Sequence, residues 1–275
     1  MSSEPKTPGA PAPLSGLPLF YRAPEPLSAA VHGAWRLKDG DVSFAADTPF
    51  VPIVVGELAA SARSYPIVFA AGNAQPIAVL GLERANLFVT NGAWVQDAYL
   101  PAYVRRYPFG FIATANPERF ALAIDGASDR VVRTGGDGVT LFDEDVKPSA
   151  TTRQALAFCE VFQSEVAATT AFVEALKAQD LLIDRRADAT LPDGRKLGLE
   201  GFQIVDAGKF AGLADDVVLD WHRRGWLALV HFHLSSLDRF SALLILQTAR
   251  AAAPAPAKAS KKPAKARAES TPADT

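Results

Sequence analysis

One amphipathic stretch in the second half of the chain constrains the fold more than any other feature. Between Thr151 and Leu176, apolar or small residues recur at steps of three and four, and Thr151 with Gln154 matches a capping box. This spacing predicts a helix of about seven turns with one apolar stripe. The stripe consists of Leu156, Cys159, Phe162, Val166, Thr169, Val173 and Leu176.

The first half of the chain contains short apolar runs separated by turn residues, which predicts antiparallel strands. Tyr65–Ala70 and Pro76–Leu82 flank a turn at 71–74 and predict a hairpin. Phe109–Thr114 and Phe120–Ile124 flank Asn116-Pro117 in the same way. Further short strands are predicted at Val51–Val55, Leu87–Thr90, Val131–Arg133 and Val139–Phe142.

A second hairpin and several helices are predicted after the long helix. Leu181–Ala187 and Lys196–Val205 flank the turn sequence Leu-Pro-Asp-Gly at 191–194, which indicates the hairpin. Asp215–Arg224 is expected to form a helix that ends at Gly225. We expect a strand at Trp226–Leu234, followed by a last amphipathic helix from Ser235 or Ser236 to about Ala249. The predicted fold class is therefore α+β, with an antiparallel β-rich first half and with helices and a hairpin in the second half.

The composition is that of a globular protein, with 49% hydrophobic and 21% charged residues. We expect one α+β domain at 17–250, between a disordered segment at 1–16 and a disordered Ala/Pro/Lys-rich tail at 251–275. From Arg250 onward, six basic residues face two acidic ones, although the whole chain has a formal net charge of −2. The sequence therefore predicts an acidic body with a basic tail.

The sequence shows no signal peptide and no apolar run of the roughly 20 residues that a membrane span requires. We expect a cytoplasmic protein that is not integral to a membrane, and peripheral association with the cell envelope remains compatible with this. The basic tail resembles nucleic-acid-binding tails in composition, but the acidic body opposes such binding. Nucleic acid is therefore not an expected partner.

The segment Tyr99–Phe111, YLPAYVRRYPFGF, is the main candidate for a binding site. Its arginines could bind carboxylate or phosphate, and its tyrosines add hydroxyl groups and stacking faces. The segment ARSYPIVF upstream repeats the Arg, Tyr and Pro pattern. Alternatively, the arginines pair with Asp or Glu and merely hold the following strand in place. The candidate anion-binding residues are Tyr103, Arg105, Arg106, Tyr107, Arg63 and Tyr65.

Two histidines form a weaker candidate metal site. On a strand, His231 and His233 would point to the same face, as two ligands of one metal would. A third ligand would have to come from Asp220, His222 or Asp238. The alternative is a pair of partly buried structural histidines, and no cofactor is otherwise predicted.

The remaining candidates have simple structural alternatives. His32 and Trp35 could contact a ligand, or they could pack together near the start of the domain. Asp206 and Lys209 could form an acid–base pair, or Asp206 could cap a short helical turn. Cys159 is the only cysteine, which excludes an internal disulfide, and its place in the stripe predicts a core residue.

Common catalytic motifs are absent from the sequence. It lacks the P-loop, the dinucleotide-binding glycine motif, the nucleophile elbow of α/β-hydrolases and the H-E-x-x-H zinc motif. ATP hydrolysis, Rossmann-type redox chemistry and α/β-hydrolase chemistry are therefore disfavoured, and no catalytic residue is assigned.

The order of several short segments resembles the SapC family across residues 17–248. The resemblance implies an accessory role linked to surface-layer (S-layer) proteins and their export, or to outer-membrane uptake systems, with no catalytic residues to carry over. The matching segments are Pro18–Tyr21, Pro26–Ser28 with His32 and Trp35, Val51–Ile53, Arg63–Phe69, Val79–Leu82, Pro101–Phe109, Ala157–Cys159, Leu199–Phe202 with Val205 and Asp206, and Gly225–Leu227.

The lead hypothesis is a soluble, non-catalytic accessory protein that binds a protein partner in an export or receptor system. The alternative is an enzyme, or an enzyme partner, acting on a peptide or amino-acid-like substrate. In that alternative, Arg105 and Arg106 hold a carboxylate, and His231 with His233 supply a metal site.

Overall fold

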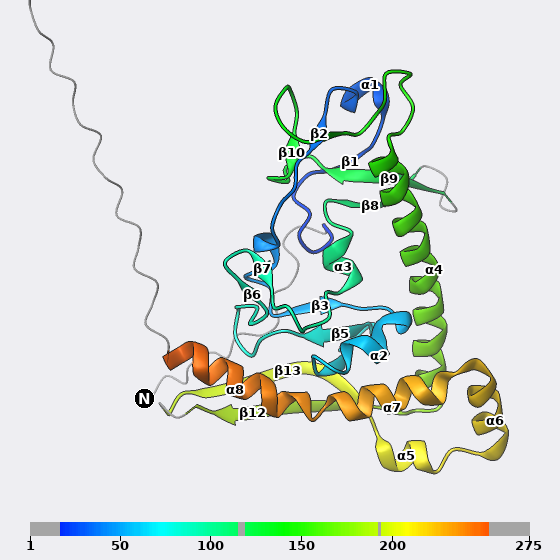
Figure 1. The fold of residues 1–275 in the computed structure, drawn as a ribbon. Helices are drawn as coiled ribbons and strands as arrows, with labels where there is room; N and C mark the ends of the chain where they lie inside the picture. Colours follow the sequence, from blue (N-terminus) through cyan, green and yellow to red (C-terminus); the bar gives the residue numbers. More distant parts are fainter. Residues whose placement is uncertain (1–16, 115–118, 192–193, 253–275) are drawn as a thin grey trace, which may run out of the picture.

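Helix α4, the long helix predicted from the sequence, spans Ala150–Ala178 and runs along one side of the molecule (Figure 1). Its N-cap is Ser149, whose hydroxyl oxygen accepts a hydrogen bond from the backbone N–H of Thr152. The cap therefore lies two residues before the predicted capping box at Thr151. Most of the predicted stripe is packed, but Leu156 is exposed and Phe172 takes a buried position that the prediction omitted.

The computed structural model describes residues 17–114, 119–191 and 194–252. Within these residues the fold is α+β, with antiparallel sheets mainly in the first half and helices mainly in the second half. The predicted disordered segment 1–16 lies outside the described residues. The predicted tail lies outside them from residue 253 onward, because residues 251 and 252 complete the last helix.

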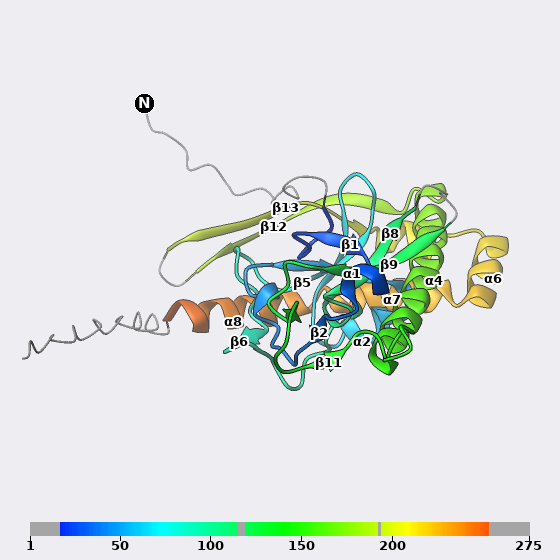
Figure 2. The same cartoon turned by 90° about the horizontal axis from the view of Figure 1, so that it is seen from above.

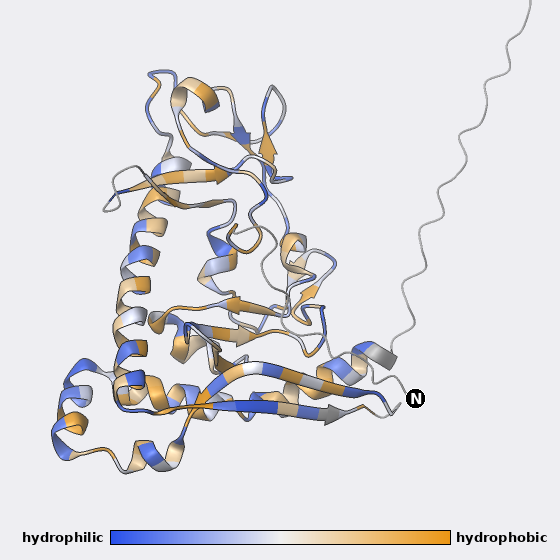
Figure 3. Ribbon diagram, turned by 180° about the vertical axis from the view of Figure 1, so that it is seen from behind, coloured by the Kyte–Doolittle hydropathy of each residue, from blue (hydrophilic) through white to orange (hydrophobic). Residues whose placement is uncertain are grey.

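The largest sheet has five strands in the order β12-β13-β4-β5-β3. Neighbouring strands in it are antiparallel, and the predicted hairpins β4–β5 and β12–β13 are confirmed. The hydrophilic residues of the edge strand β12 stand out in Figure 3, and such residues discourage pairing with another chain. The strands are β3 (Phe50–Pro52), β4 (Ile67–Ala70), β5 (Pro76–Val79), β12 (Leu182–Thr190) and β13 (Lys196–Val205).

Three smaller sheets complete the β structure. One has the order β1-β9-β8 and contains the predicted hairpin β8–β9, and in another β2 lies between β10 and β11. The third is the ribbon β6–β7. The bounds are β1 (Pro24–Pro26), β2 (Arg36–Leu37), β6 (Val89–Thr90), β7 (Ala93–Trp94), β8 (Phe109–Ala113), β9 (Phe120–Asp125), β10 (Val131–Val132) and β11 (Val139–Thr140).

Short helices connect these sheets, and the chain ends its described part with a group of helices. The short ones are α1 (Ala29–His32), the 3₁₀ turns η2 (Ser43–Ala45) and η3 (Val55–Glu57), α2 (Leu58–Ser61), α3 (Ala102–Arg105) and α5 (Ala207–Ala211). The last group is α6 (Asp215–Arg224), α7 (Trp226–Ser236) and α8 (Arg239–Ala252). Helix α8 lies beside the β12–β13 hairpin, as the view from above also shows (Figure 2).

The prediction of a strand at Trp226–Leu234 is wrong, because this stretch forms most of α7. Helix α6 ends as predicted at Gly225, which adopts the left-handed conformation (φ +73°) and starts α7 directly. The stretch begins with the continuous apolar run Trp226–Val230. Such a run has neither the period of a strand nor that of a helix, so its pattern could not decide between the two structures. The last helix begins at Arg239 and not at Ser235 or Ser236, since both serines belong to α7.

Three hydrophobic clusters meet along α4. Its first turns contribute Cys159 to a cluster around Trp35 in the β1-β9-β8 region. Its middle contributes Phe162 to a cluster around Tyr103 of α3. Its last turns contribute Phe172, with Val173 and Leu176, to the largest cluster, which surrounds the five-stranded sheet. One helix thus joins all three parts of the core.

Two helical stretches, Ala150–Ala178 and Trp226–Arg250, have the length and apolar composition of membrane spans. This is weak evidence for a membrane protein, because the core helix of a water-soluble protein passes the same test. In the second stretch, the hydroxyl of Ser236 accepts a hydrogen bond from the backbone N–H of Ile67 in β4. That polar contact joins α7 to the five-stranded sheet.

Candidate anion-binding site

A pocket of about 230 Å³ opens beside the Tyr99–Phe111 segment, where α3, β8 and the first turns of α4 meet. Three arginines line it: Arg105 from the end of α3, Arg106 from the next position, and Arg130 from the turn before β10. We call it the three-arginine pocket. Its other lining residues are Leu37, Tyr107, Pro108, Phe109, Thr151, Gln154, Ala155 and Phe158, so no acidic residue lies among them.

Arg106 is held by aromatic rings and not by a carboxylate. Its guanidinium carbon lies 4.1 Å from the ring centroid of Tyr103 and 4.5 Å from that of Phe162. Such cation–π contacts stabilise a cation without neutralising it. Its Nε is buried and has no hydrogen-bond partner among the described residues. A buried donor without a partner is costly, because it has lost its hydrogen bonds to water.

The other two arginines leave part of their hydrogen-bonding capacity for a ligand. Arg105 donates from Nε to the Leu100 carbonyl and from Nη2 to the Tyr99 hydroxyl, each over 3.1 Å. Arg130 donates from Nη1 to the Tyr107 carbonyl over 3.0 Å. Burial lowers the pKa of Arg130, but a guanidinium remains protonated in proteins. The pocket therefore presents three positive charges.

The tyrosines of the segment have structural roles. The hydroxyl of Tyr103 donates to the Leu19 carbonyl over 3.3 Å, and that of Tyr107 donates to Asp125 over 2.9 Å. Burial raises the pKa of both hydroxyls. Both side chains are buried, so the guanidinium groups, and not the tyrosine hydroxyls, are the main donors available to a ligand.

A buried carboxylate that the sequence analysis missed fixes the start of this segment. Glu57 is 4% exposed, and its Oε1 accepts from the Tyr99 hydroxyl (3.0 Å) and from the Ala102 N–H (2.6 Å). Its Oε2 accepts from the Val54 N–H over 3.1 Å. Burial raises the pKa of Glu57, although these hydrogen bonds and the charge of Arg105 act in the opposite direction.

A second buried carboxylate, also missed, fixes the end of the segment. Asp125 is fully buried at the end of β9 and accepts the Tyr107 hydroxyl. Its carboxylate also accepts hydrogen bonds from the backbone N–H groups of Ala23 (2.8 Å), Arg22 (3.2 Å) and Ala127 (3.2 Å). The two carboxylates thus hold α3 and the following turn at both ends, which positions Arg105 and Arg106 between them.

The upstream residues Arg63 and Tyr65 do not join the pocket. Tyr65 is fully buried, and its hydroxyl donates a hydrogen bond to the Tyr99 carbonyl. It therefore helps to hold the start of the Tyr99–Phe111 segment in place. Arg63 is exposed and lines a separate hollow of about 540 Å³ with Phe232 and Arg239. The structure therefore separates Arg63 from the arginines with which it was grouped.

The strand geometry on which the predicted metal site depended is absent. Because α7 is helical, His231 and His233 point about 200° apart around its axis. His233 is fully buried, and its Nε2 accepts the Val205 N–H over 3.0 Å while its Nδ1 lies 2.9 Å from the Ile67 carbonyl. His231 is exposed and packs edge-on against Phe210. The described residues contain no group of three potential ligands, so Asp220, His222 and Asp238 do not complete a site there.

The remaining candidates take structural positions. His32 is buried with its ring centroid 4.4 Å from that of Trp35, and its Nδ1 lies 3.0 Å from the Ser28 carbonyl. Asp206 caps α5 by accepting the N–H groups of Gly208 and Lys209. The Lys209 ammonium pairs with Asp180 instead of Asp206. Burial raises the pKa of the Cys159 thiol to about 11, so it stays protonated at neutral pH.

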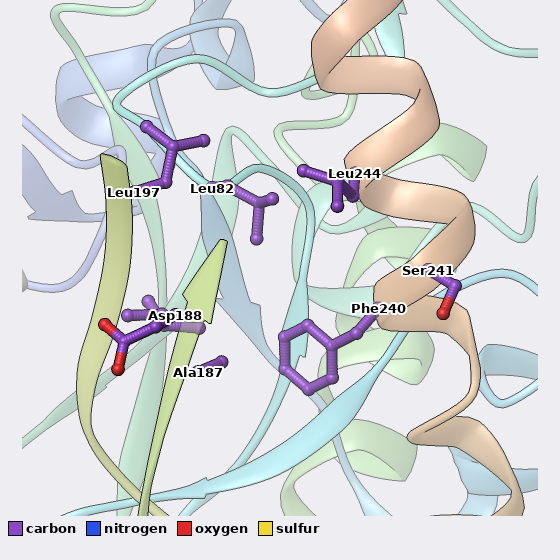
Figure 4. A pocket seen from close by; sticks show the side chains of 8 residues that line it. Leu82, Ala187, Asp188, Leu197, Phe240, Ser241 and Leu244 are labelled. Atoms are coloured by element: carbon purple, nitrogen blue, oxygen red, sulfur yellow. The ribbon is translucent and has the colours of Figure 1, made fainter. Parts of the chain in front are cut away.

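A smaller hollow of about 160 Å³ lies between the β12–β13 hairpin and α8 (Figure 4). Its walls are mainly apolar, and Leu82 faces Phe240 and Leu244 of α8 across it. The one acidic residue in its lining, Asp188, pairs with Arg186 over 2.7 Å. This hollow offers little polar chemistry, so the three-arginine pocket is the stronger candidate.

A family model for SapC matches residues 27–243 of the chain. The chain belongs to the SapC family. The matched region includes every lining residue of the three-arginine pocket in this SapC family member, and it ends within α8. Comparison with curated proteins and with solved structures gave no match.

We expect Glu57→Ala to lower the free energy of unfolding by about 3 kcal/mol, because three donors in a buried region lose their acceptor. Urea unfolding measures this change. The matched control is Glu144→Ala, since Glu144 is exposed and should leave stability unchanged. Equal stability of the two variants would contradict the role assigned to Glu57.

We expect His233 to make stability depend on pH. Burial lowers the pKa of His233 to about 4 in the folded protein, whereas an unfolded histidine has a pKa of about 6.5. Between these values only the unfolded chain binds the proton, so the free energy of unfolding should fall by about 3 kcal/mol as the pH drops from 7 to 4.

Urea unfolding of the wild type and of two histidine variants, repeated across this pH range, measures how the free energy of unfolding of each protein changes with pH. His233→Gln cannot bind the proton and should show a correspondingly weaker pH dependence. His231→Gln, on the exposed side of α7, should keep the wild-type dependence. Identical pH profiles for wild type and His233→Gln would refute the assignment.

Proposed function

We propose that this SapC family member is a non-catalytic accessory protein that binds the carboxylate of a peptide or amino-acid-like partner in the three-arginine pocket. The observation that carries the proposal is that three arginines, and no acidic residue among those described, line this pocket. A carboxylate can accept two parallel hydrogen bonds from one guanidinium group. Because both groups are charged, these hydrogen bonds are stronger than those between neutral groups.

The surroundings of the arginines favour a carboxylate attached to an apolar group. Leu37, Phe109 and Phe158 line the same pocket and offer contact area beside the three charges. A fully hydrated phosphate would gain little from these side chains, whereas an apolar residue next to a carboxylate would be partly desolvated by them. The ligand class is therefore a peptide end or an amino-acid derivative with an apolar side chain.

The pocket supports binding more than catalysis. Its lining contains no Asp, Glu, His or Cys that could act as a general base or nucleophile next to a bound ligand. Membership of the SapC family is the basis for placing the partner in a surface-layer export system or an outer-membrane uptake system. The protein would act there from the cytoplasm, through a protein partner that presents the carboxylate.

Calorimetric titration with N-acetyl-L-phenylalanine and with its amide tests the ligand class. The acid should bind about tenfold more tightly, because only the acid provides a charged acceptor. Arg106→Gln should remove this difference, whereas Arg63→Gln, which changes an exposed arginine outside the pocket, should preserve it. Equal affinities of the acid and the amide for the wild-type protein would disprove carboxylate recognition.

An affinity pull-down from separated cytosol and envelope tests the accessory role. We expect wild type and Arg63→Gln to enrich the same export or receptor component from the envelope, and Arg106→Gln to lose it. Quantitative mass spectrometry measures the enrichment. A partner retained by all three proteins would show that binding does not involve the three-arginine pocket.

A further inference from the structure

The hollow of about 540 Å³ that contains Arg63 is separate from the three-arginine pocket, and the two share no lining residue. It opens where η3 and α2 meet α7 and the first residue of α8, and α2 lies beside α7 (Figure 1). Its lining contains two arginines, Arg63 and Arg239, and no acidic residue among those described. We call it the α2–α7 hollow.

Small residues give the hollow its depth. Gly56 of η3, with Ala59 and Ala60 of α2, lines one side and leaves space in front of the backbone. Phe232 of α7 lines the other side with a half-buried ring that packs against the largest cluster. The volume lies in the range of ligand-binding sites and exceeds what a single carboxylate group fills.

The helices around the hollow are firmly held. Leu58 of α2 is fully buried in the largest cluster. His233 of α7 lies 2.9 Å from the Ile67 carbonyl and accepts the Val205 N–H over 3.0 Å, which joins α7 to two strands of the five-stranded sheet. The hollow is therefore formed before a ligand arrives, so binding requires little ordering of the protein.

The two arginines of the hollow carry charge that no described residue offsets. Arg63 and Arg239 are exposed, and neither makes an ion pair or a hydrogen bond with a described residue. By contrast, Arg224 on the exposed side of α6 lies 2.9 Å from Asp220. The α2–α7 hollow thus brings two unpaired guanidinium groups to one concave surface.

The nearest carboxylates are turned to other uses. Glu165 of α4 accepts the Gly56 N–H over 2.9 Å, and it does not line the hollow. Asp238 precedes Arg239 in the chain, but it does not line the hollow and does not pair with this arginine. Unpaired cations beside an aromatic ring are complementary to a ligand that carries both carboxylates and an apolar group.

We infer that the α2–α7 hollow binds a short acidic segment of a second protein partner, in which carboxylate side chains flank an apolar residue. Arg63 and Arg239 would donate charge-assisted hydrogen bonds to the carboxylates. The apolar residue would cover the exposed part of Phe232 and leave water. This partner is distinct from the protein that presents a carboxylate to the three-arginine pocket, and the inference does not depend on that pocket.

The hollow suits a short acidic segment better than other anions. A free phosphate ion would pair with the arginines but would leave Phe232 in water. A nucleic acid carries a long row of phosphates, of which two arginines neutralise few, and the acidic body of this protein would repel the others. A short peptide segment matches the two charges, the ring and the volume together.

Fluorescence polarisation of a labelled peptide, titrated with the full-length protein, tests the inference. The probe is a pentapeptide with a central phenylalanine between two pairs of glutamates, labelled at its N-terminus and amidated at its C-terminus. We expect the protein to bind it more tightly than the corresponding glutamine peptide, and added salt to weaken binding. Arg63→Gln with Arg239→Gln should lower the affinity about tenfold, because two charged contacts are lost. Ala59→Glu should also lower it, by placing a negative charge in the hollow.

The matched control is Arg223→Gln, since Arg223 is exposed on α6 and lines neither the hollow nor the three-arginine pocket. Thermal unfolding of each variant checks that the fold is retained. Wild-type affinity of the double arginine variant would overturn the inference, as would equal binding of the two peptides. An affinity lowered only by Arg106→Gln would also overturn it, because the peptide would then occupy the three-arginine pocket. Binding of a DNA oligonucleotide in place of the peptide, weakened by the double variant, would assign the hollow to nucleic acid instead.

Discussion

The carboxylate of Glu57 accepts hydrogen bonds from three separate places, namely Val54 just before η3, Tyr99 and the first residue of α3. Burying an ionised group is unfavourable unless its oxygen atoms are satisfied, and here both are. The position of α3 follows from this contact, and α3 in turn sets where Arg105 and Arg106 point. Asp125 holds the other end of the same segment through Tyr107. The pocket is thus built from two buried anions that hold a cationic surface between them.

Arg106 shows how the core and the pocket are related. Its guanidinium lies over Tyr103 and Phe162, which belong to the cluster where α3 meets the middle of α4. The rings keep it in place without neutralising it. The ion-pair alternative is therefore not what fixes this residue, because no described carboxylate forms an ion pair with it. A cation that is immobilised but still charged binds an anion with little loss of side-chain entropy.

Local patterns predicted those parts of the fold that local forces determine. The stripe of α4, the hairpins β4–β5 and β12–β13, and the end of α6 at Gly225 follow from periodicity and turn residues. The helix α7 was not predictable from its pattern, because its apolar residues surround the axis. The motif identified Arg105 and Arg106, but Arg130 comes from a distant turn that only tertiary contacts bring to the pocket. Glu57 and Asp125 look like ordinary surface acids until the buried donors around them are known.

The path of α4 through all three hydrophobic clusters has a consequence for how the molecule comes apart. Four separate sheets alone would suggest regions that melt independently. However, Cys159, Phe162 and Phe172 lie on one continuous helix, and each belongs to a different cluster. Loss of packing in any cluster would expose a section of this helix to water and weaken the turns on either side. The three clusters should therefore denature as one cooperative unit, with α4 as a helix that all three of them share.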